Sequence, residues 1–311
     1  MEKRRLGKTN IEVSSISYGG SPLGGVYGDN DIASQIDSVQ YAISKGINFI
    51  DTSPYYGSKL SETVLGDALK GVPRDKYYLG TKVGRYGLSD FNFSYDTIIA
   101  SVKESMQRMG VDYLDVVQCH DIEFGDLGQV INESIPALLK LKSDGLVRHI
   151  GVTGYPLSAI ERVVEARGPC LDVILSYCHY TLNDSTLQSS LPVFQQHDIG
   201  VINASFLNMG MLTNRGPPAW HPAPDKLKQK CVEAAELCKS RGSDISKLAL
   251  QFATMNPSIH TNLVGMPCRQ QVDLNLETLS QPIDDQLLQD VLELFKPLKD
   301  LIWTSGKPEN N

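Results

Sequence analysis

The feature that most constrains this chain is a repeated alternation of short apolar runs with longer stretches of helical hydrophobic spacing. Such alternation predicts strand–helix–strand units with right-handed crossovers and therefore a parallel sheet. The predicted strands cover residues 16–18, 49–50, 77–79, 114–117, 147–152, 173–175, 201–204 and 263–264. The predicted helices cover residues 32–44, 62–69, 97–108, 131–142, 158–165, 187–196, 227–239 and 270–278.

Two folds share this local pattern, a closed (β/α)8 barrel and an open doubly wound sheet. A doubly wound nucleotide-binding sheet carries G-x-G-x-x-G after its first strand, and the glycines at positions 19, 20, 24, 25 and 28 lack that spacing. Gly7-Lys8-Thr9 resembles the end of a P-loop, but Glu2 stands where the first glycine of that motif belongs. We therefore predict an α/β fold of the TIM-barrel type.

We expect one barrel domain over residues 1–311. A β-hairpin over residues 3–13 would cap the barrel, and residues 284–300 would add a C-terminal helix. The polar segment 305–311 is predicted to be a loose tail.

Charge and hydropathy exclude several classes of partner. The formal net charge of -7 argues against a nucleic-acid-binding protein, because phosphate binding requires a basic face. The longest uncharged stretch, residues 248–268, contains Asn256, Pro257 and His260, so it predicts helix, turn and strand rather than a membrane span. The first residues lack the apolar run of a signal peptide, which favours a cytoplasmic protein.

Polar side chains follow three successive predicted strands at the point where each strand ends. Asp51 and Tyr56 follow the second strand, Lys82 follows the third, and His120 follows the fourth. Because the carboxyl ends of the strands carry the site in a barrel of this type, we expect these four side chains to converge.

These residue types together predict a proton-transfer centre. A phenol titrates near pH ~10, so we expect the Lys82 ammonium to lower the pKa of Tyr56 and Asp51 to keep Lys82 charged. A histidine that donates to a substrate oxygen would orient and polarise it. Such a centre facing an alcohol or a carbonyl serves hydride transfer when a nicotinamide lies opposite.

Three other functions use the same residues differently. Lys82 could form a Schiff base in a lyase or aldolase. A metal site from Cys119, His120, Cys178 and His179 is disfavoured, because adjacent strand residues point to opposite faces, and we predict no metal. The third alternative is a non-catalytic subunit that keeps the barrel and regulates a partner.

Several motifs resemble the aldo-keto reductase family over nearly the whole chain. They are DTSPYYG (51–57), TK (81–82), His120, IGVTG (150–154), NASFLNMGMLT (203–213) and VGM followed by Asn275. The resemblance implies a (β/α)8 barrel and a nicotinamide dinucleotide bound without a Rossmann motif. It also implies that Tyr56 is the acid/base, that Lys82 and Asp51 tune it, and that His120 orients the substrate.

The same resemblance assigns the cofactor contacts. Gln271 stands where family members that prefer NADP carry a basic residue, which favours NAD over NADP, although Arg269 is near. Gly154 and Ala204 depart from the family pattern at positions that contact the nicotinamide. The implied cofactor-binding residues are Thr153, Ser176, Tyr177, Ser205, Leu207, Gly210, Gly265, Arg269, Gln271 and Asn275.

Three further stretches, CHDIEFG (119–125), DVILSYCHYTLNDSTL (172–187) and GPPAWHPAP (216–224), resemble family members that act on sugars. This resemblance implies NAD-dependent oxidation of the anomeric carbon of L-galactose to the lactone, as in ascorbate biosynthesis. The alternatives are an L-fucose or D-arabinose dehydrogenase and an NADPH-dependent aldehyde or ketone reductase. The candidate sugar contacts are Tyr55, Asp121, Trp220 and His221.

Overall fold

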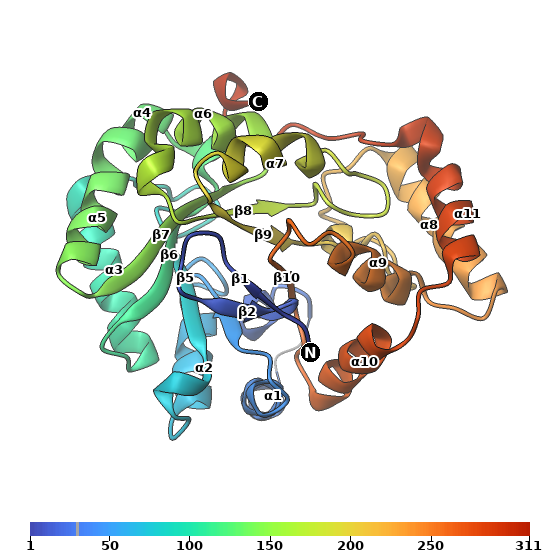
Figure 1. Ribbon diagram of the computed structural model, residues 1–311, viewed down its shortest axis with the longest axis horizontal. Coiled ribbons are helices and arrows are strands. Elements are labelled where there is room, and N and C mark those ends of the chain that lie inside the picture. Colours follow the sequence, from blue (N-terminus) through green and yellow to red (C-terminus); the bar gives the residue numbers. More distant parts are fainter. Residues whose placement is uncertain (29–30) are drawn as a thin grey trace.

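The fold is a closed barrel of parallel strands surrounded by helices (Figure 1). The computed structural model describes residues 1–28 and 31–311. Within these residues, eight strands close in the order β10-β3-β4-β5-β6-β7-β8-β9, which confirms the predicted (β/α)8 barrel. The barrel strands are β3 (Ile16–Gly19), β4 (Phe49–Asp51), β5 (Tyr78–Val83), β6 (Leu114–Cys119), β7 (Val147–Gly154), β8 (Val173–Tyr177), β9 (Gly200–Ala204) and β10 (Thr261–Val264).

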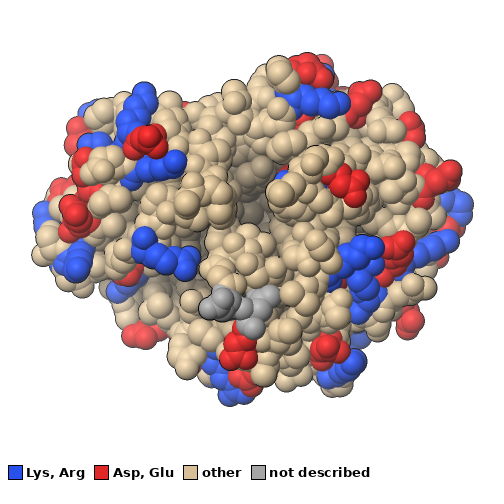
Figure 2. All heavy atoms as spheres, turned by 180° about the vertical axis from the view of Figure 1, so that it is seen from behind, with Lys and Arg blue, Asp and Glu red and all other residues tan. Residues whose placement is uncertain are grey.

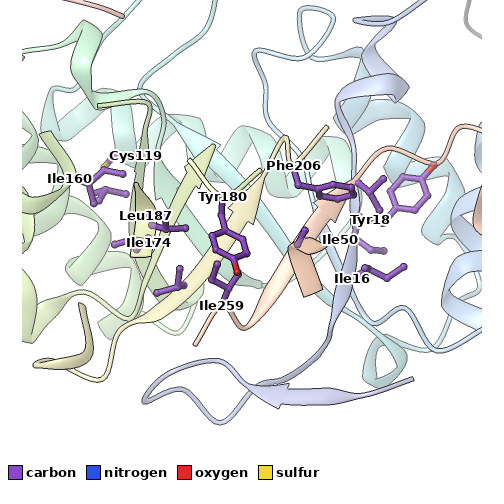
Figure 3. Close-up of a cluster of buried hydrophobic side chains, with 14 of the residues drawn as sticks. Ile16, Tyr18, Ile50, Cys119, Ile160, Ile174, Tyr180, Leu187, Phe206 and Ile259 are labelled. Atoms are coloured by element: carbon purple, nitrogen blue, oxygen red, sulfur yellow. The ribbon is translucent and has the colours of Figure 1, made fainter. Parts of the chain in front are cut away.

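Side chains of the barrel strands alternate between two apolar clusters. Phe49 and Val116 belong to a small cluster that also contains the hairpin residue Leu6. The next residue on each strand, Ile50 and Val117, belongs to a large cluster that includes the buried faces of the helices, part of which is drawn in Figure 3. This alternation follows from the two-residue repeat of a strand, and it explains why the strands are apolar on both faces.

A hairpin caps the amino-terminal end of the barrel, as predicted. Strands β1 (Lys3–Arg5) and β2 (Glu12–Ser14) pair in antiparallel fashion. The turn at Gly7 has a φ of +54° and lies against β9, where a Cβ would come within 2.2 Å of the backbone nitrogen of Gly200. Only glycine fits this backbone conformation and this approach without strain.

Helices cover the outside of the barrel and match the predicted amphipathic stretches to within a few residues. Two helices, α8 and α9, separate β9 from β10, and a π-helical turn (Val130–Ser134) joins α4 to α5. None of the helices in residues 1–28 and 31–311 is long and apolar enough to span a membrane. The helices are α1 (Ile32–Ser44), α2 (Leu60–Leu69), α3 (Tyr95–Met109), α4 (Leu127–Gln129), α5 (Ile135–Ser143), α6 (Leu157–Arg167), α7 (Leu187–Gln195), α8 (Asp225–Ser240), α9 (Ile245–Thr254), α10 (Arg269–Ser280) and α11 (Asp285–Phe295).

The C-terminal segment contains the predicted extra helix, α11, which packs against α8. Residues 305–311 are not loose, so that expectation is wrong. The Asn310 side-chain amide donates to the carbonyls of Glu123 (2.9 Å) and Gly125 (3.0 Å), and the Lys307 N–H donates to the same Glu123 carbonyl (2.9 Å). Buried carbonyls beside the barrel mouth require donors, and the tail supplies them.

The hydrogen bonds of Asn310 predict a measurable role for the tail in stability. In Asn310→Ala the two buried carbonyls lose their side-chain donor, so we expect the free energy of unfolding to fall by about 1–3 kcal/mol. Urea denaturation measures this change. Lys307→Ala is the matched control, because its backbone N–H stays in place and its side chain is exposed. An Asn310→Ala variant as stable as the control would contradict the prediction.

Candidate active site

A buried ion pair forms the centre of the site at the carboxyl ends of β4 and β5. The Lys82 ammonium contacts the Asp51 carboxylate, and both side chains are almost fully buried. Lys82 Nζ also donates to the Thr52 carbonyl (3.0 Å) and to Tyr56 Oη (3.4 Å). The structure therefore brings together Asp51, Lys82 and Tyr56 as predicted, and His120, the fourth predicted side chain, lies against Tyr56.

The strand register explains this geometry. Asp51 pairs with Gly80 across β4 and β5, and Lys82 pairs with Gln118 across β5 and β6. The Gln118 side-chain amide donates to the second Asp51 oxygen at 3.2 Å, so both carboxylate oxygens have partners. Burial acts to lower the pKa of Lys82, but Asp51 and Tyr56 raise it, and the net pKa lies above its ordinary value. Lys82 is therefore an ammonium at neutral pH.

The electrostatics of Tyr56 differ from the prediction. Burial raises the pKa of Tyr56 above its ordinary value, and the charge and hydrogen bond of Lys82 only partly oppose this rise. The expectation of a net lowering is wrong, because sequence reasoning included the nearby cation but not the loss of water around the phenol. Tyr56 is therefore a neutral phenol whose ionised form is stabilised by Lys82.

His120 lies directly after β6 and faces Tyr56 edge-on. The two ring centroids are 5.8 Å apart and the rings are nearly perpendicular, at 89°. The pKa of His120 is well below its ordinary value, because burial disfavours the imidazolium and the cations Lys82 and Arg85 repel it. His120 is thus a neutral ring that can donate one N–H at the barrel mouth.

Arg85 is a residue of the site that sequence reasoning missed. Its guanidinium stacks on the ring of Tyr55, 3.9 Å from the centroid, and contacts the buried carboxylate of Asp121. The same Asp121 carboxylate lies 3.6 Å from Nε2 of His120. Opposite charges after neighbouring strands, Arg85 after β5 and Asp121 after β6, were the signal that could have identified this pair.

A groove of about 490 Å³ extends from Asp51 and Tyr56 across the ends of β9, β10 and β3 to Gln271. Figure 2 shows the end of the barrel opposite the hairpin, hollowed in the middle and surrounded mainly by uncharged residues. The groove includes five predicted cofactor residues: Ser205, Leu207, Gly210, Gly265 and Gln271. It also includes residues that were not predicted: Gly19, Gly20, Ser21, Pro22, Tyr27, Thr213 and Arg215.

The shape of the groove suits an extended dinucleotide. Gly20 lies so close to β4 that a Cβ would stand 2.9 Å from the Asp51 carbonyl, so the backbone at this wall carries no side chain that would fill the groove. Ser176, at the end of β8 but not among the residues that line the groove, has a buried hydroxyl oxygen without a hydrogen-bond partner. An unpartnered buried oxygen of this kind is consistent with a polar ligand group, so the residues present fit a nicotinamide dinucleotide.

Other predicted cofactor residues do not line the groove. Tyr177 donates its hydroxyl to Glu123 (3.2 Å), on the side of the C-terminal tail. Arg269 is exposed and contacts Asp37 on α1. Thr153 is buried in β7, and Asn275 is half-buried on α10. These four residues and Ser176 were predicted from the family resemblance, which does not show where each side chain points.

The predicted sugar contacts also separate into two groups. Tyr55 and Asp121 lie beside His120, as described above. Trp220 is 54% exposed, and its ring lies 6.2 Å from that of Tyr27, which lines the groove. His221 is buried: its Nε2 donates to the Asn208 carbonyl (3.0 Å) and its Nδ1 accepts the Ala223 N–H (3.1 Å). With both nitrogens engaged by the backbone, His221 has none free for a sugar.

Two alternative chemistries are disfavoured by the geometry. A Schiff base requires a neutral amine, whereas Lys82 is an ammonium held by Asp51. His179 is held by the Tyr155 carbonyl (2.7 Å) and by Thr186 (2.9 Å), so it is not directed toward His120. Among the residues described, no three His, Cys, Asp or Glu side chains are grouped so as to hold a metal ion.

A parallel barrel with a buried Tyr–Lys–Asp centre at one end of a dinucleotide-sized groove defines a class, the nicotinamide-dependent oxidoreductases built on a (β/α)8 barrel. Comparison with known sequences makes the assignment specific. The sequence pattern of the Aldo/keto reductase family matches residues 15–295, and the chain belongs to this family. It is therefore an NAD(P)-dependent oxidoreductase.

Individual relatives cover nearly the full chain. L-galactose dehydrogenase from Arabidopsis thaliana is 46% identical, with 100% of this chain and 99% of that protein aligned. D-arabinose 1-dehydrogenase from Saccharomyces cerevisiae is 35% identical, with 95% of each aligned. Among solved structures, the holo form of an aldo-keto reductase from Bacillus halodurans superposes with a TM-score of 0.80 at 25% identity, covering 98% of this chain and 99% of that one.

The buried ion pair predicts strong energetic coupling between Asp51 and Lys82. Lys82→Met leaves a buried carboxylate and Asp51→Asn a buried ammonium, so we expect each to lower the free energy of unfolding by about 3–5 kcal/mol. The double variant should lose less than the sum, because neither charge is then left unpaired. Urea denaturation of all four proteins gives the coupling energy.

The control for this cycle is the exposed pair of Lys140, on α5, and Asp144, the residue directly after α5. Lys140→Ala should change stability by less than about 1 kcal/mol. Strictly additive losses for the Asp51 and Lys82 variants would show that the two charges do not depend on each other.

Proposed function

We propose that this protein oxidises the anomeric carbon of L-galactose to the lactone, with NAD as the hydride acceptor. The reaction rests on one observation, the 3.4 Å contact between Lys82 Nζ and Tyr56 Oη at the end of the groove. The identity of the sugar rests on the full-length similarity to the Arabidopsis L-galactose dehydrogenase. The reaction would then belong to ascorbate biosynthesis. The cytoplasmic location of the protein stays a prediction.

The chain's own residues would move the proton. Tyr56 Oη takes the proton of the anomeric hydroxyl, and the Lys82 ammonium stabilises the phenolate form that makes this possible. The neutral His120 ring donates its N–H to the same substrate oxygen and holds it between the two groups. When bound, the nicotinamide supplies the acceptor for the hydride that leaves the anomeric carbon.

Recognition of the sugar would fall to residues beside His120. Asp121 offers carboxylate oxygens that accept hydrogen bonds from ring hydroxyls, and Arg85 holds that carboxylate in position. The ring of Tyr55 lies 5.9 Å from that of His120, so an apolar wall stands next to the donor. Trp220 is exposed and would stack on a sugar face at the outer edge of the mouth.

The choice of NAD rests on charges at the far end of the groove. Gln271 lines the groove and offers a neutral amide, which hydrogen-bonds a ribose hydroxyl but gives a 2′-phosphate no charge pairing. Arg269, a cation two residues before Gln271 on α10, is paired with Asp37 and stacks on Tyr41, 4.7 Å from its centroid. Thr153, Ser176 and Asn275 stay predictions for the nicotinamide and adenine ends.

A panel of sugars tests this proposal directly. L-galactose, L-fucose and D-arabinose are each offered with NAD and with NADP, and the absorbance of the reduced cofactor is followed. We expect the highest kcat/KM for L-galactose with NAD. A higher kcat/KM for L-fucose or D-arabinose would make that sugar the preferred substrate. Faster NADPH-dependent reduction of simple aldehydes would instead indicate an aldehyde reductase. No turnover with any combination would favour the non-catalytic subunit.

The control variant for the panel is Tyr56→Phe, which keeps the ring and removes the transferable proton. We expect kcat to fall by about 10²–10⁴-fold, the usual contribution of general acid–base catalysis. In the wild type, oxidation should become faster as pH rises, because the raised pKa of Tyr56 leaves little of the base form at neutral pH. Near-normal turnover in Tyr56→Phe would contradict the mechanism.

The charge argument at Gln271 predicts a change in cofactor preference. Gln271→Arg places a guanidinium where a 2′-phosphate would lie, so the ratio of kcat/KM for NADP to that for NAD should rise by about tenfold or more. Gln286→Arg, on α11 and outside the groove, adds the same charge elsewhere and should leave the ratio unchanged. Equal ratios in the two variants would mean that Gln271 does not face the ribose.

A further inference from the structure

Ser53 is a buried residue of the DTSPYYG motif, and its hydroxyl lies between Tyr55 and His120. The side chain is fully buried. Its Oγ lies 3.0 Å from Nδ1 of His120 and accepts the backbone N–H of Tyr55 at 3.1 Å. The Ser53 carbonyl accepts the N–H of Tyr56 at 3.1 Å, so the same turn that presents Tyr56 also positions this hydroxyl.

The donors and acceptors around Ser53 determine the direction of its hydrogen bond with His120. A serine hydroxyl has a single proton to donate, and the oxygen of Ser53 already accepts from Tyr55. Within the residues that the structure describes, no second acceptor competes for the Ser53 proton. Ser53 therefore donates to Nδ1 of His120, and a nitrogen that accepts carries no proton. In a neutral imidazole the proton then lies on Nε2.

The other side of the ring favours the same tautomer. Nε2 of His120 lies 3.6 Å from a carboxylate oxygen of Asp121, which is held by Arg85. A protonated Nε2 is attracted to this carboxylate, whereas a lone pair there would be repelled. His120 is also kept neutral by burial and by two nearby cations, so a single proton on a defined nitrogen decides what the ring offers.

The proposed reaction requires that tautomer. The reacting hydroxyl of an alcohol substrate has a single proton, and Tyr56 takes it. The hydroxyl can therefore only accept from His120, and a ring that presented a lone pair would compete with Tyr56 for the proton. A donor N–H from His120 leaves the substrate proton directed at Tyr56.

We propose that Ser53 is a positioning residue that sets the Nε2–H tautomer of His120, so that the ring presents a donor to the substrate oxygen. This inference rests on the proposed oxidation for its consequence in catalysis, but the tautomer itself is a property of the protein without substrate. Ser53 acts through His120 and does not touch the reacting atoms.

The test measures the tautomer directly. Long-range ¹H–¹⁵N correlation spectra of ¹⁵N-histidine-labelled protein distinguish a protonated from an unprotonated ring nitrogen, and a His120→Gln spectrum assigns the signal. We expect the Nε2–H form in the wild type and a mixture of tautomers in Ser53→Ala. With sugar and NAD, kcat should fall about tenfold, the effect of losing one hydrogen bond, at an unchanged KM for NAD.

Two further variants separate tautomer control from simple packing. Ser53→Thr keeps the hydroxyl and should retain both the Nε2–H signal and kcat. If Ser53→Ala does not fold, the wild-type spectrum still tests the inference, because a proton on Nδ1 of His120 would overturn it. Ser105→Ala removes a hydroxyl that is equally buried but lies on α3, and should change neither. A wild-type tautomer in Ser53→Ala overturns the inference. If the tautomer shifts but no sugar is oxidised, the inference stands and the proposed function falls.

Discussion

The structure of this site depends on a lysine and an aspartate that are buried together at the mouth of the barrel. Two charges removed from water are tolerated only when each is paired and its remaining hydrogen-bonding capacity is used. One carboxylate oxygen of Asp51 contacts Lys82 and the other accepts from Gln118. Lys82 donates its remaining hydrogens to the Thr52 carbonyl and to Tyr56. Tyr56, which would carry the proton, is therefore held by the same contacts that compensate for the burial of the charges.

The mouth of the barrel is divided by Tyr56. On one side, the ends of β3, β9 and β10 form the long groove, which is lined by glycines, by apolar side chains and by a few polar ones such as Arg215 and Gln271. On the other side, His120, Asp121 and Arg85 form a compact polar cluster after β5 and β6. This division supports the proposal that a dinucleotide and a sugar approach the same phenol from opposite directions.

Much of the fold and of the catalytic centre could be predicted from the sequence, because both depend on local order along the chain. Apolar runs identified the strands, and the residues directly after them lie at the carboxyl ends, where the barrel brings them together. The predicted binding residues that do not line the site fail for one reason, side-chain direction. Tyr177 turns to Glu123, His221 to backbone groups, and Arg269 to Asp37, and no spacing rule indicates these choices.

The sequence by itself determined the barrel, the strand ends that carry the chemistry, and the family. It did so because strand and helix periodicity and motif spacing are properties of consecutive residues. Only the tertiary structure decided the charge states and the partners. The raised pKa of Tyr56, the pairing of Arg85 with Asp121, the docking of the tail by Asn310 and the hydroxyl of Ser53 on His120 all depend on burial and on contacts between segments distant in the chain. Burial and such contacts exist only once the barrel has closed.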